Sequence, residues 1–190
     1  MTALLGGTFN PPHNGHVALA REAERQFADG VVVLVAARPG HKEVDVDAET
    51  RLELARAAFP DNEVELDPYE RTVDMLQAAR WREPLFLIGA DEFCNFLEWK
   101  DPEGVVARAR LAVATRPGYP RERLERVLAR LSRPERVQFF EIEPLPISSE
   151  DIRDRVARGE PVDALVPAGV ARLIESRGLY GASRYTSRGT

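Results

Sequence analysis

The chain has 190 residues, enough for one substantial hydrophobic core, so we expect a single domain. Its 26 lysines and arginines against 31 aspartates and glutamates give a net charge of −5, which offers no basic field for a nucleic acid or a membrane surface. Cys94 is the single cysteine, which excludes an intrachain disulfide and a cysteine zinc site. No signal peptide is recognisable and no apolar run approaches the roughly 18 residues of a spanning helix, so we expect a cytoplasmic protein.

Short apolar runs alternate with amphipathic stretches along the whole chain. In order, the pattern predicts a strand at 4–5, a helix at 15–27, a strand at 31–35, a helix at 49–59, a strand at 64–66, a helix at 72–80, a strand at 85–88, a helix at 102–110, a strand at 111–115, a helix at 121–131, a strand at 137–142, and helices near 152–158 and 168–177. This alternation predicts a Rossmann-like, doubly wound α/β sheet, mainly parallel, with helices on both faces and a C-terminal helical segment.

Two glycine-rich segments directly follow predicted strands. Gly6-Gly7-Thr8 comes after the first strand, and Gly89-Ala90-Asp91 comes after the strand at 85–88. Open parallel sheets bind ligands in the crevice beyond the carboxyl ends of their strands. We therefore expect both segments at the ligand-binding edge of the sheet.

The loop Asn10-Pro11-Pro12-His13-Asn14-Gly15-His16 leads into the first predicted helix. Asn14 can cap that helix, and helix amides together with the macrodipole favour an anion. His13 and His16 are three residues apart, so both can face one direction, and an imidazole with a pKa near neutrality can donate to phosphate and carry charge. Two alternatives remain: a capped turn with two surface histidines, and a metal pair without an obvious third ligand. The glycine spacing fits neither a P-loop nor a dinucleotide fingerprint.

Residues 146–153 form a second informative stretch, Pro-Ile-Ser-Ser-Glu-Asp-Ile-Arg. Ser148 with Asp151 fits a capping box, and Ile152 begins the buried face of a helix. An ordinary helix start explains all of this stretch except Arg153, whose planar fork could reach a phosphate from the first turns.

The run from Gly6 to His16 resembles the signature of the nucleotidylyltransferase superfamily, in the form carried by bacterial nicotinate-nucleotide adenylyltransferases. That signature usually reads Gly-Gly-Thr-Phe-Asp-Pro-Pro-His-x-Gly-His, and here Asn10 stands at the aspartate position. Residues 147–153 resemble the superfamily's Ile-Ser-Ser-Thr-x-Ile-Arg motif, with Glu150 at the threonine position.

Further segments resemble the same family and occur in its order. Residues 71–74 are similar to a Tyr-Thr-Val-Asp segment, with Arg71 at the tyrosine position. The other matches are His41-Lys42, 87–91, Trp99, 116–118 and 178–180. The resemblance covers residues 4–181 and implies a single nucleotidylyltransferase domain over 1–181, followed by a polar, disordered tail over 182–190.

The resemblance implies transfer of the adenylyl group of ATP to nicotinate mononucleotide, giving nicotinate adenine dinucleotide and pyrophosphate in NAD biosynthesis. Its catalytic residues would be His16, His13 and Arg153. Contacts to ATP and its phosphates would come from Gly7, Thr8, Phe9, His13, His16, Lys42, Gly89, Asp91, Ile147, Ser148 and Arg153. The mononucleotide would contact Thr72, Asp74 and Trp99. Mg²⁺ would arrive with ATP, because no carboxylate cluster suggests a permanent metal site.

Other functions fit parts of the same pattern. The chain could use nicotinamide mononucleotide, pantetheine phosphate or a cytidylyl donor, could bind a nucleotide without catalysis, or could be a structural α/β protein. Trp99 stands between Glu98 and Lys100, a polar context that favours stacking on a ligand over a place in the core. With residues 72–74, it favours a pyridine nucleotide. The sequence leaves open whether the chain forms a homo-oligomer.

Overall fold

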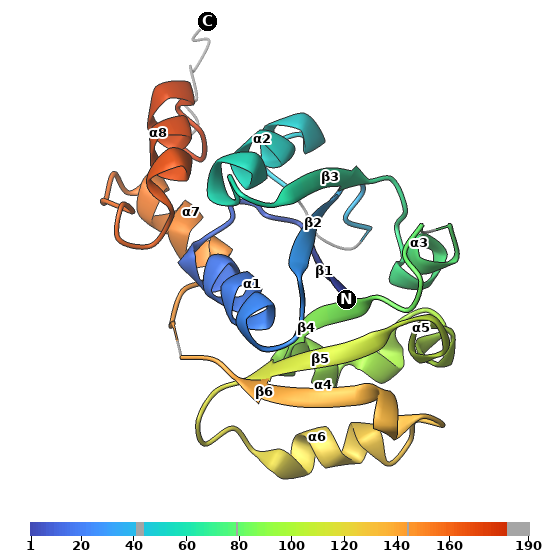
Figure 1. Cartoon of the computed structure of the whole chain (residues 1–190). Helices are drawn as coiled ribbons and strands as arrows, with labels where there is room; N and C mark the ends of the chain where they lie inside the picture. Colours follow the sequence, from blue (N-terminus) through green and yellow to red (C-terminus); the bar gives the residue numbers. More distant parts are fainter. Residues whose placement is uncertain (41–43, 79, 144, 182–190) are drawn as a thin grey trace, which may run out of the picture.

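A computed structural model provides the fold and describes residues 1–40, 44–78, 80–143 and 145–181. A six-stranded sheet in the order β3-β2-β1-β4-β5-β6 crosses the molecule, and every neighbouring pair is parallel (Figure 1). The strands are β1 (Thr2–Gly7), β2 (Gly30–Ala36), β3 (Glu63–Asp67), β4 (Leu85–Gly89), β5 (Arg110–Thr115) and β6 (Val137–Glu141). The predicted doubly wound parallel sheet is confirmed.

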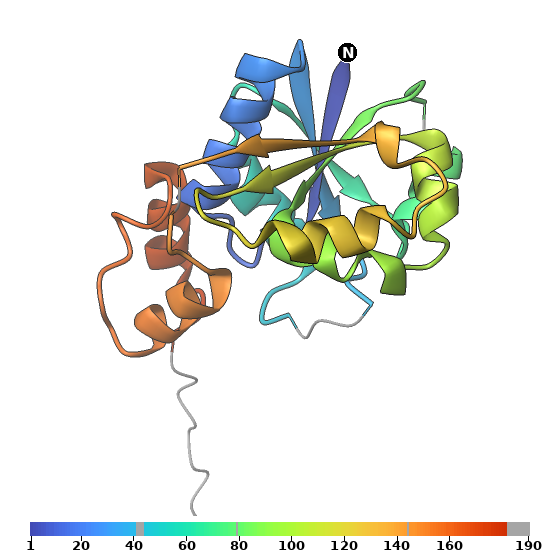
Figure 2. The same ribbon diagram turned by 90° about the horizontal axis from the view of Figure 1, so that it is seen from below.

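Helices cover both faces of this sheet (Figures 1 and 2). One face carries α1 (Asn14–Gln26), α2 (Ala48–Ala58), α7 (Ser149–Ala157) and α8 (Ala168–Arg177). The other face carries α3 (Thr72–Ala78), α4 (Ala90–Cys94), the 3₁₀ turn η1 (Phe96–Glu98), α5 (Pro102–Arg108) and α6 (Arg121–Leu128). A second 3₁₀ turn, η2 (Pro134–Arg136), precedes β6.

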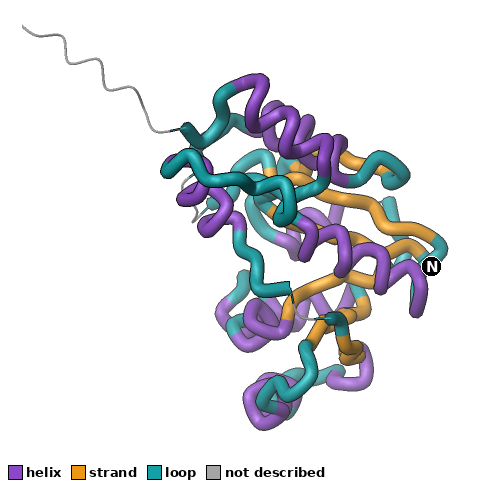
Figure 3. Tube along the Cα trace, turned by 90° about the vertical axis from the view of Figure 1, so that its left-hand side faces the viewer, coloured by secondary structure: helices purple, strands orange, loops and turns teal. Residues whose placement is uncertain are grey.

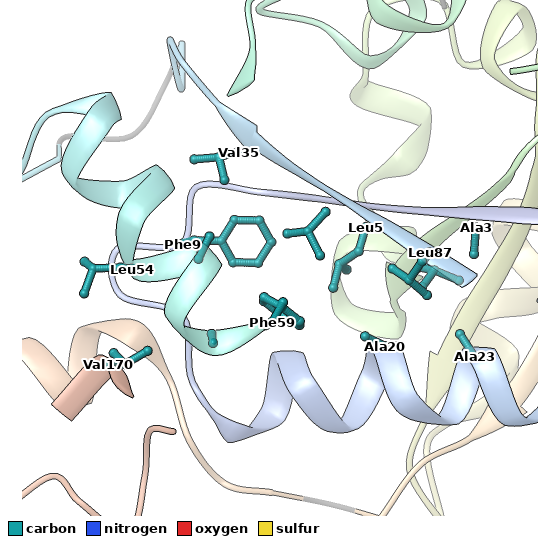
Figure 4. Close-up of a cluster of buried hydrophobic side chains, with 14 of the residues drawn as sticks. Ala3, Leu5, Phe9, Ala20, Ala23, Val35, Leu54, Phe59, Leu87 and Val170 are labelled. Atoms are coloured by element: carbon teal, nitrogen blue, oxygen red, sulfur yellow. The ribbon is translucent and has the colours of Figure 1, made fainter. Parts of the chain in front are cut away.

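The two faces of the sheet belong to separate hydrophobic clusters, because successive strand side chains point to opposite sides. In β1, Leu5 packs with α1 and α2 in the first cluster, whereas Leu4 packs with α3 and α5 in the second. Figure 4 shows the first cluster, where Phe9 and Phe59 lie among Leu5, Val35 and other apolar side chains. The four inner strands β1, β2, β4 and β5 are buried on both faces, as their continuous apolar runs predict.

The predicted C-terminal helical segment is confirmed as α7 and α8. Residues 158–167 join them as a loop, drawn in teal in Figure 3, and this loop meets the start of α1, where the Asn14 N–H donates to the Leu165 carbonyl at 2.9 Å. Sequence periodicity did not predict α4 or η1, which are too short to show a helical repeat. Within the described ranges, no helix is long and apolar enough to cross a membrane. The tail at 182–190 lies outside the described residues, and the domain boundary stays a prediction.

Candidate active site

A cleft of about 960 Å³ lies at the carboxyl ends of β1, β4 and β5. Its lining includes the loop after β1, residues 38–40 after β2, the first turn of α1, the start of α4, residues 142–150 except 144 and 148, and Arg153 of α7. β1 and β4 are adjacent at the centre of the sheet, where the strand order reverses. Such a switch point is where open α/β sheets bind ligands, and the volume suits one or two small molecules.

The loop after β1 is anchored to the core by Phe9. Phe9 has a φ of 51° and is 2% exposed, with its ring centroid 5.1 Å from that of His16 and 5.9 Å from that of Phe59. A Cβ at Gly7 would lie 2.9 Å from the Phe9 ring, so the glycine allows Phe9 to fold back over it. The side chain of Phe9 therefore holds the loop in place beneath the cleft.

A buried arginine fixes the same loop from below. The Arg51 side chain, 1% exposed, donates to the carbonyls of Thr8 at 3.0 Å, Ala36 at 2.6 Å and Ala37 at 3.3 Å. Burial lowers the pKa of its guanidinium. These bonds join the chain after β1 to the chain after β2. Sequence reasoning missed Arg51, although its helical spacing with Leu54, Ala55 and Ala58 puts a charge on the apolar face of α2.

The rings of the two histidines contact each other at the start of α1, with their planes inclined by 33°. Their ring centroids are 3.7 Å apart, and both residues line the cleft. His16 Nδ1 accepts from the His13 backbone N–H at 3.2 Å, which leaves the proton of the neutral His16 ring on Nε2. The predicted common orientation of the pair is confirmed. The predicted cap is wrong: His13 is the N-cap, and Asn14 Nδ2 instead donates to the Ala164 carbonyl at 3.1 Å.

The start of α7 contributes further residues to the cleft that the histidines line. Ser148 caps the helix, its Oγ accepting from the Asp151 N–H at 3.0 Å, which confirms the predicted capping interaction. Ser148 is not among the residues that line the cleft, whereas Ser149 and Ile147 are, and Ser149 Oγ donates to the Pro11 carbonyl at 2.8 Å. Arg153 also lines the cleft. Sequence reasoning chose the first of two adjacent serines, and helix geometry turns the second one toward the cleft.

The ends of β4 and β5 form another wall of the cleft. Asp91 accepts from the Tyr119 hydroxyl at 2.9 Å and lies 3.9 Å from Arg116 Nη2. Partial burial, then hydrogen bonds to Cys94 and Asp91, raise the pKa of Tyr119, so its hydroxyl remains a donor at neutral pH. A Cβ at Gly89 would meet no protein atom within 4 Å, so the space beside this glycine belongs to the cleft.

The wall beyond β4 is aromatic. Trp99 lines the cleft and packs against Phe86 and Phe96, with ring centroids 6.2 and 5.2 Å away. Thr72 and Arg71 line the cleft beside it. Asp74 is not a lining residue: both its carboxylate oxygens accept from Lys100 Nζ at 2.9 Å, which ties α3 to the residue after Trp99.

The structure therefore brings most of the predicted site together. The predicted residues that line the cleft are Gly7, Thr8, Phe9, His13, His16, Thr72, Gly89, Asp91, Trp99, Ile147 and Arg153. Lys42 lies outside the described residues. Within the part of the chain that the structure describes, no group of three or more histidine, cysteine, aspartate or glutamate side chains is arranged to hold a metal ion.

Comparison with known proteins identifies the family of this chain. A model of the family described as cytidylyltransferase-like matches residues 4–155. Two relatives carry the name "Probable nicotinate-nucleotide adenylyltransferase": the Rubrobacter xylanophilus protein is 36% identical over 202 residues, covering 98% of this chain and 94% of the relative, and the Exiguobacterium sibiricum protein is 38% identical over 193 residues, covering 93% and 97%. The chain belongs to the cytidylyltransferase-like family.

Solved structures agree with this membership at the level of the fold. The Plasmodium falciparum nicotinic acid mononucleotide adenylyltransferase complexed with NaAD has a TM-score of 0.75 at 16% identity, covering 94% of this chain and 96% of the other. The same protein complexed with APC has a TM-score of 0.72. The resemblance to nucleotidylyltransferases and the Rossmann-like fold are thus confirmed for this member of the cytidylyltransferase-like family.

The two cleft histidines of this cytidylyltransferase-like protein differ in environment. Burial lowers the pKa of His13 to about 4, so its imidazole is neutral at neutral pH. The expectation of an imidazole that can carry charge near neutrality is therefore not supported by the environment of His13. Because the two ring centroids are only 3.7 Å apart, positive charges on both rings at once would repel each other.

The lowered pKa of His13 predicts how the free energy of unfolding depends on pH in this cytidylyltransferase-like fold. Below its ordinary value of 6.5 the unfolded His13 binds a proton, whereas the folded His13 does so only near pH 4. The free energy of unfolding should therefore fall as the pH drops from 6.5 to 4, by up to about 3 kcal/mol from this residue. His13→Gln should flatten that part of the curve in urea unfolding at pH 4, 5 and 6.5. Parallel curves for the two proteins would contradict the assignment.

Proposed function

We propose that this protein transfers the adenylyl group of ATP to nicotinate mononucleotide, giving nicotinate adenine dinucleotide and pyrophosphate in NAD biosynthesis. The observation that carries the proposal is the gathering of His13, His16 and Arg153 in one cleft that Trp99 also lines. Phosphate-binding groups and a stacking surface in one cavity suit a nucleotide and a pyridine nucleotide together. The names of relatives 36% and 38% identical over nearly their whole lengths support the same reaction.

ATP is assigned to the half of the cleft between β1 and α7. His16, with His13 beside it, would contact the α-phosphate, and the backbone at Gly7 and Thr8 would approach the phosphates closely. Arg153 and Lys42 would hold the β- and γ-phosphates, together with Ser149 and the N-terminal amides of α7, whose first turn Ser148 caps. Ser149 takes the place proposed for Ser148 because it is the serine that lines the cleft.

The adenosine and the acceptor are assigned to the remaining walls. Gly89 leaves open space and Asp91 and Tyr119 offer polar contacts at the end of β4, where the adenosine would lie. Trp99 would stack on the pyridine ring, and Thr72 would line its other edge. Asp74 would act on the mononucleotide only through Lys100, the residue next to Trp99.

The chemistry requires positioning and charge stabilisation. A phosphate oxygen of the mononucleotide attacks the α-phosphorus of ATP, the new P–O bond forms, and the bond to the departing pyrophosphate breaks. Alignment of the two substrates can contribute about 7–11 kcal/mol, and donors preorganised around the phosphates stabilise the charge of the transition state. We assign Mg²⁺ to the ATP substrate, and no covalent enzyme intermediate is needed.

A substrate panel with detection of pyrophosphate tests this function. ATP with nicotinate mononucleotide should give the highest kcat/KM, above ATP with nicotinamide mononucleotide or pantetheine phosphate and above CTP with any acceptor. A higher kcat/KM for another pair would replace the substrate assignment. ATP binding without turnover on any acceptor would indicate a nucleotide-binding module.

Replacing Trp99 tests the position of the acceptor. Trp99→Ala should raise the KM for nicotinate mononucleotide by about 10- to 100-fold, the loss of one base-stacking contact, and leave the KM for ATP nearly unchanged. Trp81→Ala is the matched control, because Trp81 packs against the same hydrophobic cluster without lining the cleft. A selective rise in the KM for ATP would reverse the assignment of the two walls.

A further inference from the structure

Arg153, Asp45 and Asn10 come from separate segments and form a cluster at the edge of the cleft. Asp45, which precedes α2, lies with its Oδ2 3.0 Å from Arg153 Nε. The same oxygen accepts from Asn10 Nδ2 at 3.2 Å. Arg153 Nη1 donates to the backbone carbonyl of Asn10 at 2.9 Å.

These contacts occupy two of the three nitrogens of the guanidinium. Nε is held by Asp45 and Nη1 by the Asn10 carbonyl, and both acceptors lie outside α7. Within the described ranges, Nη2 makes no hydrogen bond, while Arg153 as a whole lines the cleft. A free arginine side chain has many rotamers. When two nitrogens of the planar guanidinium are fixed, the direction of the third is set before a ligand binds.

Asn10 supports the same arrangement from the core side. It is 4% exposed, and its amide nitrogen faces Asp45, while no described residue donates to its Oδ1. A carboxylate at position 10 would lie within hydrogen-bonding distance of the Asp45 carboxylate. The two groups would repel each other when both are charged. The cluster therefore combines one carboxylate, one amide and one guanidinium.

We propose that Asp45 is a positioning residue for Arg153, which it fixes together with the Asn10 carbonyl so that the guanidinium meets the polyphosphate of the bound nucleotide. The inference rests on the proposed function for the identity of that nucleotide. The opposite role for a carboxylate beside a phosphate-binding arginine is competition with the phosphate for the guanidinium. The Asp45 side chain is 55% exposed, so water screens its charge, and the loss of geometry outweighs the loss of repulsion when it is removed.

The dissociation constant of Mg-ATP, measured by calorimetry, tests the proposal. Asp45→Ala should weaken ATP binding by about tenfold, whereas Asp45→Asn, which keeps an acceptor oxygen, should weaken it by no more than about threefold. The KM for nicotinate mononucleotide should stay unchanged in both variants, which general damage to the fold would not allow.

Moving the carboxylate provides a second, independent measurement. Asn10→Asp should weaken ATP binding by about tenfold, because two carboxylates then face each other. The double variant Asn10→Asp with Asp45→Asn again holds one carboxylate and one amide, and should bind ATP within about threefold of the unchanged protein. Glu53→Ala is the control: it breaks a similarly exposed pair with Arg177, at 2.6 Å, away from the cleft, and should leave ATP binding unchanged.

The outcomes separate this inference from the proposed function. Equal or tighter ATP binding by Asp45→Ala would overturn the positioning role and favour competition. A double variant that binds no better than Asn10→Asp alone would also overturn it. Absence of both ATP binding and turnover in the unchanged protein would instead contradict the proposed function, and the inference that rests on it would fail with it.

Discussion

His16→Ala is expected to lower kcat by about 10²- to 10⁴-fold while the protein remains folded. The His16 ring lines the cleft in the first turn of α1, and its Nδ1 is held by the His13 N–H. Its Nε2 proton is therefore directed by the fold before any substrate binds. Removing the ring deletes a preorganised donor at the α-phosphate, where charge develops in the proposed transition state.

The stability of this variant can be measured alongside its turnover. The lost bond to the His13 N–H resembles the loss of a helix cap, worth about 1 kcal/mol, or about 2–4 °C in Tm for a chain of this size. Arg21→Ala, an exposed change on the same helix, is the control and should alter neither quantity. Turnover close to that of the unchanged protein in His16→Ala would contradict the assigned role.

Arg153→Ala is expected to lower kcat/KM for ATP by about 10²- to 10³-fold. The variant removes the cation proposed for the β- and γ-phosphates. It also removes the donor to the Asn10 carbonyl and the ion pair with Asp45. Arg153→Lys should recover little of this loss, because a single ammonium cannot contact both acceptors and a phosphate in the geometry of a fork.

Steady-state rates at varied ATP concentration measure this effect. Arg155→Ala is the matched control, since Arg155 is an exposed arginine on the same helix with only a 3.9 Å pair to Glu160 and does not line the cleft. Full activity in Arg153→Lys would show that charge alone is required and would contradict the role of the fork.

Periodicity in the sequence was sufficient for the sheet and for most helices. Continuous β-branched runs such as residues 31–35 predict strands buried on both faces, and β2 is such a strand. Periodicity was insufficient for α4, whose five residues span little more than one turn. The end of α6, at Leu128, also lies short of the predicted limit of 131, because the periodic pattern runs on past the last helical bond.

The site was predictable where it consists of contiguous motifs. The histidine loop and the segment at 147–153 were found from the order of their residues, and both line the cleft. Contacts between distant segments carry no such signal: Asp45 meets Arg153 across more than 100 positions, and Lys100 meets Asp74 across 26. The lowered pKa of His13 also arises from packing around the ring, which its sequence neighbours do not define.

The division of the core by the sheet has a consequence for how such an enzyme can evolve. Phe9 and Ile152, which support the loop and helix assigned to ATP, pack in the first hydrophobic cluster, whereas Trp99 and Phe86 pack with the second. Substitutions that reshape the wall proposed for the acceptor should therefore be accommodated on one side of the sheet, while the side proposed for the phosphates keeps its packing. A change of acceptor can accumulate gradually in such a scaffold without loss of the nucleotide donor.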